Sequence, residues 1–102
     1  MGRKVAVIAS ANLSHKLTQQ SPNGYDASGE QFDKELCRLV ESYDVENILD
    51  FDLNLAERAA QEGLGQIAVL LGTLNGLEIK ADFLSYEAPL GVGHMVASFG
   101  IL

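Results

Sequence analysis

Two histidines and a few carboxylates are the side chains of this 102-residue chain that are best suited to catalysis. His15 follows a short apolar run, in a turn rich in serine and asparagine over residues 10–15. An imidazole titrates near neutral pH, so a histidine beside a cleft suits proton transfer. A polar loop histidine without a role explains the same position equally well. Position alone therefore leaves both interpretations open.

The other polar candidates each have a structural explanation of their own. Glu62 comes just before an apolar helix, where the helix dipole favours a carboxylate whether or not it binds a ligand. Tyr25 lies in a turn-forming segment, and Glu87 ends a strand. His94 lies in a hairpin that we predict at the edge of the sheet, where an exposed or interface role fits it best. Cys37 falls beside an apolar stripe and is predicted to be a small buried hydrophobe.

A buried strand and a helix are predicted to position His15. Residues 5–9 form a continuous apolar run, which is typical of a strand buried on both faces. In open α/β sheets, ligands bind beyond the carboxyl ends of the strands, which is where residues 10–15 fall. A long loop over 17–29 follows. From Glu30, apolar residues recur at helical spacing and predict an amphipathic helix with Asp33 on its polar face.

The rest of the chain contains helical and extended patterns that together predict an α/β fold. Residues 65–74 are apolar almost all the way round, so this helix should be covered on nearly every side. We predict a partial three-layer α/β/α domain, whose short mixed sheet ends in a C-terminal antiparallel hairpin packed by helices. The remaining predicted elements are a helix over 45–49, a helix capped by Asp52 or Asn54 and ending near Gly63, and strands over 77–83 and 95–99.

Composition restricts the partners and the compartment. Fourteen acidic side chains against seven basic ones give a net charge of −7. This balance argues against nucleic acid and anionic membranes as partners, because both require a basic surface. The chain has no apolar run of the ~18 residues that a membrane helix needs and no signal segment at its start, so we expect a cytoplasmic protein. The single cysteine excludes an intramolecular disulfide.

Four segments, in order, resemble one known family. Residues 7–17, Val-Ile-Ala-Ser-Ala-Asn-Leu-Ser-His-Lys-Leu, are similar to the strand and turn of class III (LigB-type) extradiol ring-cleavage dioxygenases, which typically read S-G-D-L-S-H. Residues 21–26 resemble the loop that follows, 62–74 the next helix, and 85–99 the closing hairpin. The resemblance covers essentially the whole chain. It extends to Memo-like relatives, whose function is not simple ring cleavage.

The resemblance implies roles for five residues. His15 falls on the family's acid–base histidine, and Glu62 falls on the carboxylate of a two-histidine, one-carboxylate metal site. Such a site leaves open positions on Fe(II) for a catecholate and O₂, and zinc is a second possible metal. Asn12, Tyr25 and Glu87 are expected to shape the substrate pocket. Asn12 stands where the family usually has aspartate, which removes a negative charge near His15.

The resemblance also implies that part of the metal site lies outside this chain. The family's two histidine ligands belong to an N-terminal half of about 150 residues, so residues 1–102 correspond to the C-terminal portion of one catalytic domain. Alone, the chain should bind no structured ferrous ion. Separately from the resemblance, the apolar helix over 65–74 lacks cover in so short a chain and predicts self-association into a homo-oligomer. The intact protein should open a catechol-type aromatic ring with O₂. The alternative is a Memo-like, non-oxygenase module that binds a metal or a partner.

Overall fold

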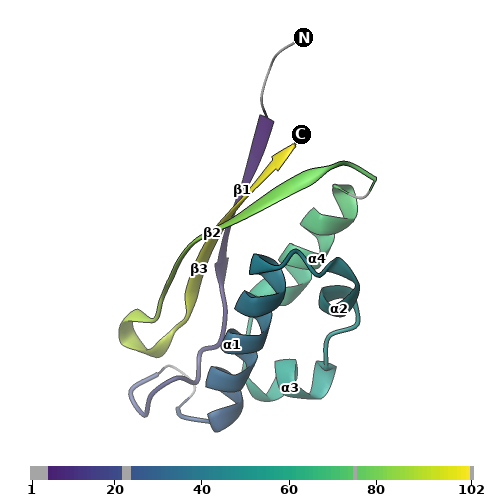
Figure 1. Ribbon diagram of the computed structural model, residues 1–102. Helices are drawn as coiled ribbons and strands as arrows, with labels where there is room; N and C mark the ends of the chain where they lie inside the picture. Colours follow the sequence, from purple (N-terminus) through teal and green to yellow (C-terminus); the bar gives the residue numbers. More distant parts are fainter. Residues whose placement is uncertain (1–4, 22–23, 75, 102) are drawn as a thin grey trace.

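The computed structural model describes residues 5–21, 24–74 and 76–101. Within these residues, three strands form one sheet and the helices lie on one side of it, as Figure 1 shows, which confirms the α/β class. Along the chain the elements are β1 (Val5–Asn12), α1 (Ala27–Glu41), α2 (Val45–Leu49), α3 (Leu53–Arg58), α4 (Gly63–Thr73), β2 (Ile79–Glu87), a 3-10 turn (Pro89–Gly91) and β3 (His94–Ile101).

The central strand of the sheet is β3, with β1 and β2 on either side of it. Both pairings are antiparallel, so the sheet is antiparallel throughout the described residues, where we expected a mixed one. β2 and β3 form the predicted C-terminal hairpin, with a bulge between Phe83 and Ser85. Because β1 pairs with the side of β3 that lies opposite β2, His94 is on the central strand and not at the predicted edge.

One face of the sheet packs against the helices, and the other face is open. Alternate residues of β3 are fully buried, while those between them are only partly covered. β1 is buried at Ala11, but Val5 and Ile8 expose more than half of their surface. The prediction that β1 is buried on both faces was therefore wrong for the part of the chain that the structure describes. The third layer of the predicted α/β/α arrangement is not among these residues.

Helix α1 supplies a large part of the core. It begins earlier than the predicted start at Glu30, because the Asp26 carboxylate accepts a hydrogen bond of 2.9 Å from the Ser28 amide and caps the helix. Its apolar stripe faces the sheet and the other helices, as the periodicity predicted. The buried apolar residues of α1 are Phe32, Leu36, Leu39 and Val40.

The helices α2 and α3 follow as two short pieces. α2 matches the predicted range, and Asp52 is the residue that caps α3. α3 ends at Arg58, before the predicted end near Gly63, because Ala60 adopts a left-handed conformation with φ of 49°. This early end leaves a short connection between α3 and α4 that passes close to the end of β1.

Helix α4 is the apolar helix, and the described residues cover only one side of it. Ile67 and Leu71 are buried, whereas Val69 on the other side is 70% exposed. The expectation of cover on nearly every side is therefore not met within the described ranges. No helix in this part of the chain is long and apolar enough to cross a membrane.

Gly63 allows α4 to start directly against the end of β1. A Cβ atom at this position would lie 2.8 Å from the Asn12 carbonyl oxygen and 2.9 Å from Cδ2 of Leu13. These distances are too short for real contacts, so any larger side chain would push α4 away from the strand. The glycine thereby determines where the preceding residue, Glu62, is held.

We expect Gly63→Ala to lower the free energy of unfolding by about 1–3 kcal/mol, the usual cost of overpacking. Gly65→Ala is the matched control, because a Cβ there has nothing within 4 Å. Alanine is favoured over glycine in a helix by roughly 0.5–1 kcal/mol, so the control should be slightly stabilised. Urea denaturation measures both variants. Equal stability of the two would contradict the close packing of α4 on β1.

Candidate functional site

The turn after β1 carries His15, and hydrogen bonds hold this turn from two sides. The Leu13 amide donates to the Gly93 carbonyl at 2.7 Å, and the Gly93 amide donates to the Ser14 carbonyl at 3.0 Å. The Ser14 hydroxyl donates to the Ala59 carbonyl at 2.7 Å. His15 is therefore held where the end of β1, the hairpin and the end of α3 meet.

The Ala60 carbonyl determines the orientation and the tautomer of the His15 ring. Its oxygen lies 2.8 Å from Nδ1 of His15 and also accepts the His15 amide at 3.3 Å. A carbonyl has no proton to donate, so Nδ1 carries the proton and Nε2 keeps the lone pair of the neutral ring. The left-handed conformation of Ala60 costs about 1–2 kcal/mol for a residue with a Cβ. This conformation ends α3 and lets the same carbonyl meet His15.

The other ring nitrogen of His15 faces Glu62. Nε2 and Oε1 of Glu62 are 3.4 Å apart, and the side chains are 17% and 64% exposed. The imidazole is thus mostly enclosed, while the carboxylate is open to another ligand. Gln61 holds the connection in place, because it pairs with Ser14 as an isolated bridge and its side chain accepts the Leu64 amide at 2.8 Å.

A buried carboxylate, Asp33, lies beneath the turn. Its Oδ1 accepts the Ser14 amide at 3.0 Å, and its Oδ2 accepts a short hydrogen bond from the Tyr86 hydroxyl of β2. Burial raises the pKa of Asp33 above its usual range, against the opposing effects of these two hydrogen bonds and of nearby His15. Burial, the hydrogen bond to Asp33 and its negative charge also raise the pKa of Tyr86. The prediction that Asp33 lies on the exposed polar face of α1 was wrong, because the turn and β2 cover it.

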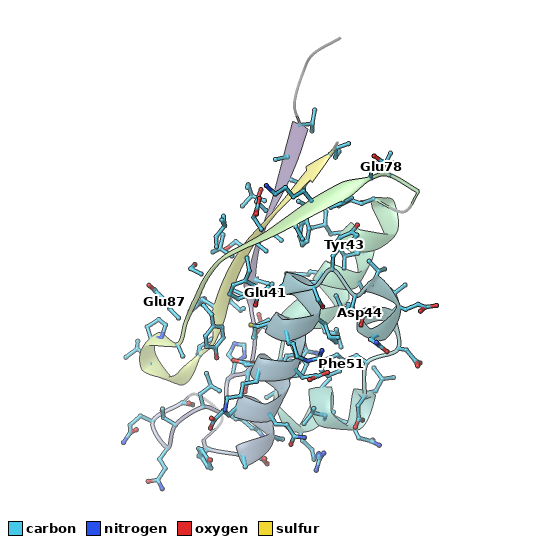
Figure 2. The ribbon with its side chains drawn as sticks, in the orientation of Figure 1. Glu41, Tyr43, Asp44, Phe51, Glu78 and Glu87 are labelled. Atoms are coloured by element: carbon cyan, nitrogen blue, oxygen red, sulfur yellow. The ribbon has the colours of Figure 1, made fainter. Side chains whose placement is uncertain are left out.

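The three predicted pocket residues lie elsewhere. Asn12 and Glu87 both stand opposite His94 in the strand register, one on each side of it. The three form a row on the sheet face turned away from the helices. Figure 2 shows Glu87 at the hairpin end of β2, on the side away from α1. Tyr25 is 55% exposed in the loop before α1, and none of the predicted pocket residues forms a hydrogen bond or ion pair with the His15 or Glu62 side chain in the described structure.

Glu62 is the one predicted metal ligand of this site. Within the described ranges, no three His, Cys, Asp or Glu side chains lie close enough together to hold a metal ion. Cys37 does not add a ligand, because burial raises the pKa of its thiol to about 12 and keeps it protonated. A metal site built on Glu62 therefore requires further ligands from outside the described residues.

The raised pKa of Asp33 has a consequence for stability. The folded chain binds the Asp33 proton more tightly than the unfolded chain, whose aspartates titrate near about 3.9. The tighter binding of this proton stabilises the folded state fully below that pH. This stabilisation is lost as pH rises through the folded-state pKa. We therefore expect the wild type to lose stability relative to Asp33→Asn over the pH range above about 4, where the unfolded chain has already released this proton. Urea denaturation across this range tests the sign, and a relative gain by the wild type would contradict it.

Comparison with known proteins gives matches over nearly the whole chain. Residues 2–99 match the family described as the catalytic LigB subunit of aromatic ring-opening dioxygenase. Protein CA_C1420 of Clostridium acetobutylicum is 41% identical over 96 residues. These residues are 94% of this chain and 20% of that relative, so the chain spans only a small part of the relative's length. The chain belongs to the family of catalytic LigB subunits of aromatic ring-opening dioxygenases.

Proposed function

We propose that the chain is part of a non-haem, Fe(II)-dependent enzyme that opens a catechol-type aromatic ring with O₂, and that His15 is its acid–base group. The observation that carries this proposal is the geometry of the His15 ring: Nδ1 is tied to Ala60, and Nε2 lies 3.4 Å from Glu62. One nitrogen is thus free to take up or release a proton at a fixed place beside a carboxylate. Family membership supports the reaction class.

Glu62 is proposed as the carboxylate ligand of the metal. Its side chain makes no capping hydrogen bond to α4 and is 64% exposed, so its oxygens are available. A carboxylate together with two imidazoles leaves positions on a ferrous ion where a catecholate and O₂ can bind side by side. The same ligand types also bind zinc. The two imidazoles are proposed to come from another part of the intact protein.

His15 is proposed to move a proton at Nε2. A substrate hydroxyl within hydrogen-bonding reach of Nε2 would give its proton to the lone pair. The imidazolium formed would be stabilised by Glu62 beside it and by the buried Asp33 carboxylate. Nδ1 stays bonded to Ala60 in both protonation states, so the ring need not turn when the proton is exchanged.

Asn12, Tyr25 and Glu87 remain proposed pocket residues. All three are exposed, two on the open face of the sheet and one in the loop before α1. They would contact a substrate that lies over the end of the sheet, which requires another part of the protein to close that side.

We further propose that the chain is the C-terminal portion of one catalytic domain and that the rest of this domain packs on β1 and α4. β1 is an outer strand with no charged residue, proline or bulge over residues 5–12. The opposite edge strand, β2, carries Lys80, Asp82 and Glu87 and a bulge. Charges and bulges discourage further strand pairing, so β1 is the edge suited to accept another strand.

A hollow between β1 and α4 supports this placement. It has a volume of about 170 Å³ and is lined by residues 8–11 of β1 and by Gln66, Ile67 and Leu70 of α4. Exposed Val69 on the same helix and exposed Ile8 on the strand add apolar surface. In the intact protein we propose that the remainder of the domain covers this surface. When the chain is alone, a second copy would cover it and produce a homo-oligomer.

The chain expressed alone should self-associate through β1 at micromolar concentration. Ile8→Lys places a charge in the middle of this edge strand and should shift the chain towards monomer. Leu84→Lys is the matched control, because Leu84 is similarly exposed at 56% on the opposite edge strand, and it should leave the association unchanged. Light scattering measures the three proteins. A monomeric wild type at micromolar concentration would contradict the proposed interface.

In the intact protein, His15→Asn should remove most turnover and keep the fold. The asparagine amide nitrogen stands in for Nδ1 and can still donate to Ala60, but nothing replaces Nε2. We expect kcat for catechol-dependent O₂ consumption to fall by about a hundredfold to ten-thousandfold, the usual contribution of general acid–base catalysis, with unchanged iron content.

Glu62→Gln should instead lower the iron content, while exposed Glu57→Gln serves as its control.

Each outcome separates the proposed roles. Undiminished turnover in His15→Asn would disprove the acid–base role. Unchanged iron content in Glu62→Gln would disprove the ligand role. An intact wild-type protein that binds metal and consumes no O₂ with catechols would overturn the ring-opening proposal and favour a Memo-like binding module.

A further inference from the structure

We infer that Asp33 is a positioning residue for His15, acting through Ser14 and Tyr86; this inference rests on the proposed acid–base role of His15. Asp33 lies on α1, far from His15 in the sequence, and is only 3% exposed. It makes no hydrogen bond to the His15 ring in the described structure. Its influence passes through the backbone of the residue that precedes His15.

The Ser14 amide is the first contact of this arrangement. It donates to Oδ1 of Asp33 at 3.0 Å, which fixes the backbone one residue before His15. The Ser14 hydroxyl donates to the Ala59 carbonyl and accepts the Lys16 amide at 3.0 Å, which fixes the residue that follows His15. The backbone on both sides of His15 is therefore held by groups anchored in α1 and α3.

The hairpin closes over the same carboxylate from the other side. The Tyr86 hydroxyl donates to Oδ2 of Asp33. Gly93 passes so close that a Cβ there would lie 3.0 Å from the Tyr86 hydroxyl oxygen and would collide with the Asp33 carboxylate. The carboxylate thus connects α1, the His15 turn and β2 at one point, with Gly93 of the hairpin turn packed directly against it.

An apolar side chain at this position would avoid the cost of burying a carboxylate. It could not accept the Ser14 amide, however, and a buried amide without a partner would draw the turn towards another acceptor or water. Any such shift moves the His15 ring away from the Ala60 carbonyl, which is the contact that determines the free nitrogen. Displacements of about 1 Å are enough to reduce catalysis strongly. Asp33 therefore contributes to where Nε2 lies.

Two substitutions of Asp33 test this inference in the chain as it stands. Asp33→Leu removes both acceptors, whereas Asp33→Asn retains one oxygen for the Ser14 amide. Glu41→Leu is the matched control, because Glu41 is an exposed carboxylate at the other end of α1. The measurements are amide hydrogen exchange of Ser14, His15 and Lys16, and the ¹⁵N chemical shifts of the His15 ring.

In Asp33→Leu we expect the Ser14 amide to exchange about tenfold faster or more, relative to the core amides of α1, since it loses a hydrogen bond to a charged group. The His15 ring should change from one tautomer to a mixture. Asp33→Asn should show a smaller effect, and Glu41→Leu none. A merely structural role would accelerate the exchange of all core amides together and leave the tautomer unchanged, and that result would overturn the inference.

Tyr86→Phe provides a second route if Asp33→Leu does not fold. It removes one hydroxyl and keeps the ring. The Ser14 amide should exchange faster than in the wild type, but the acceleration should be smaller than that caused by the loss of both acceptors. An unchanged exchange rate of this amide in both Tyr86→Phe and Asp33→Asn would overturn the inference. In the intact protein, Asp33→Asn should lower kcat with little change in KM. If His15→Asn leaves turnover untouched, the proposed function fails, while the exchange and tautomer measurements still decide the positioning role.

Discussion

The hydrogen bond between Nδ1 of His15 and the Ala60 carbonyl is the contact on which the site depends. The two residues are 45 positions apart, so the bond exists only when β1 and the connection after α3 lie side by side. Gly63 permits that approach because it lacks a Cβ. The left-handed conformation of Ala60 ends α3 early enough for the Ala60 carbonyl to reach His15. The chemistry of the ring thus follows from backbone geometry at two small residues that have no functional groups of their own.

The sequence predicted the individual helices and strands better than it predicted which of them lie next to one another in the sheet. Helix α1 and the hairpin strands follow from local periodicity, because the spacing of apolar residues depends only on the element that contains them. Strand order depends on contacts between distant segments, so β3 was not expected at the centre of the sheet. The same limit explains the error on β1: a continuous apolar run indicates two covered faces, but it does not indicate which part of a protein supplies the cover.

The same limit applies to the site: sequence segments identified some of its residues, and only contacts between distant segments identify the others. Position alone left the roles of His15 and Glu62 open, and the resemblance of whole segments then gave each a role. The structure brings their side chains together. Ala60 and Asp33 escaped prediction for different physical reasons. Ala60 acts through its carbonyl oxygen, which every residue possesses. Asp33 falls among exposed acidic residues on the helix pattern, and only its partners on the turn and on β2 distinguish it from them.

The proposed acid–base and metal functions differ in how much of the protein they need. The Ala60 carbonyl contacts the His15 ring, and the Asp33 carboxylate and the Ser14 hydroxyl hold the backbone before it. All three groups belong to the described residues. The metal site has one proposed ligand here, and a single carboxylate does not hold a ferrous ion against water. The proposed proton transfer therefore depends on groups of the described residues, whereas the proposed metal site also depends on ligands from elsewhere in the intact protein.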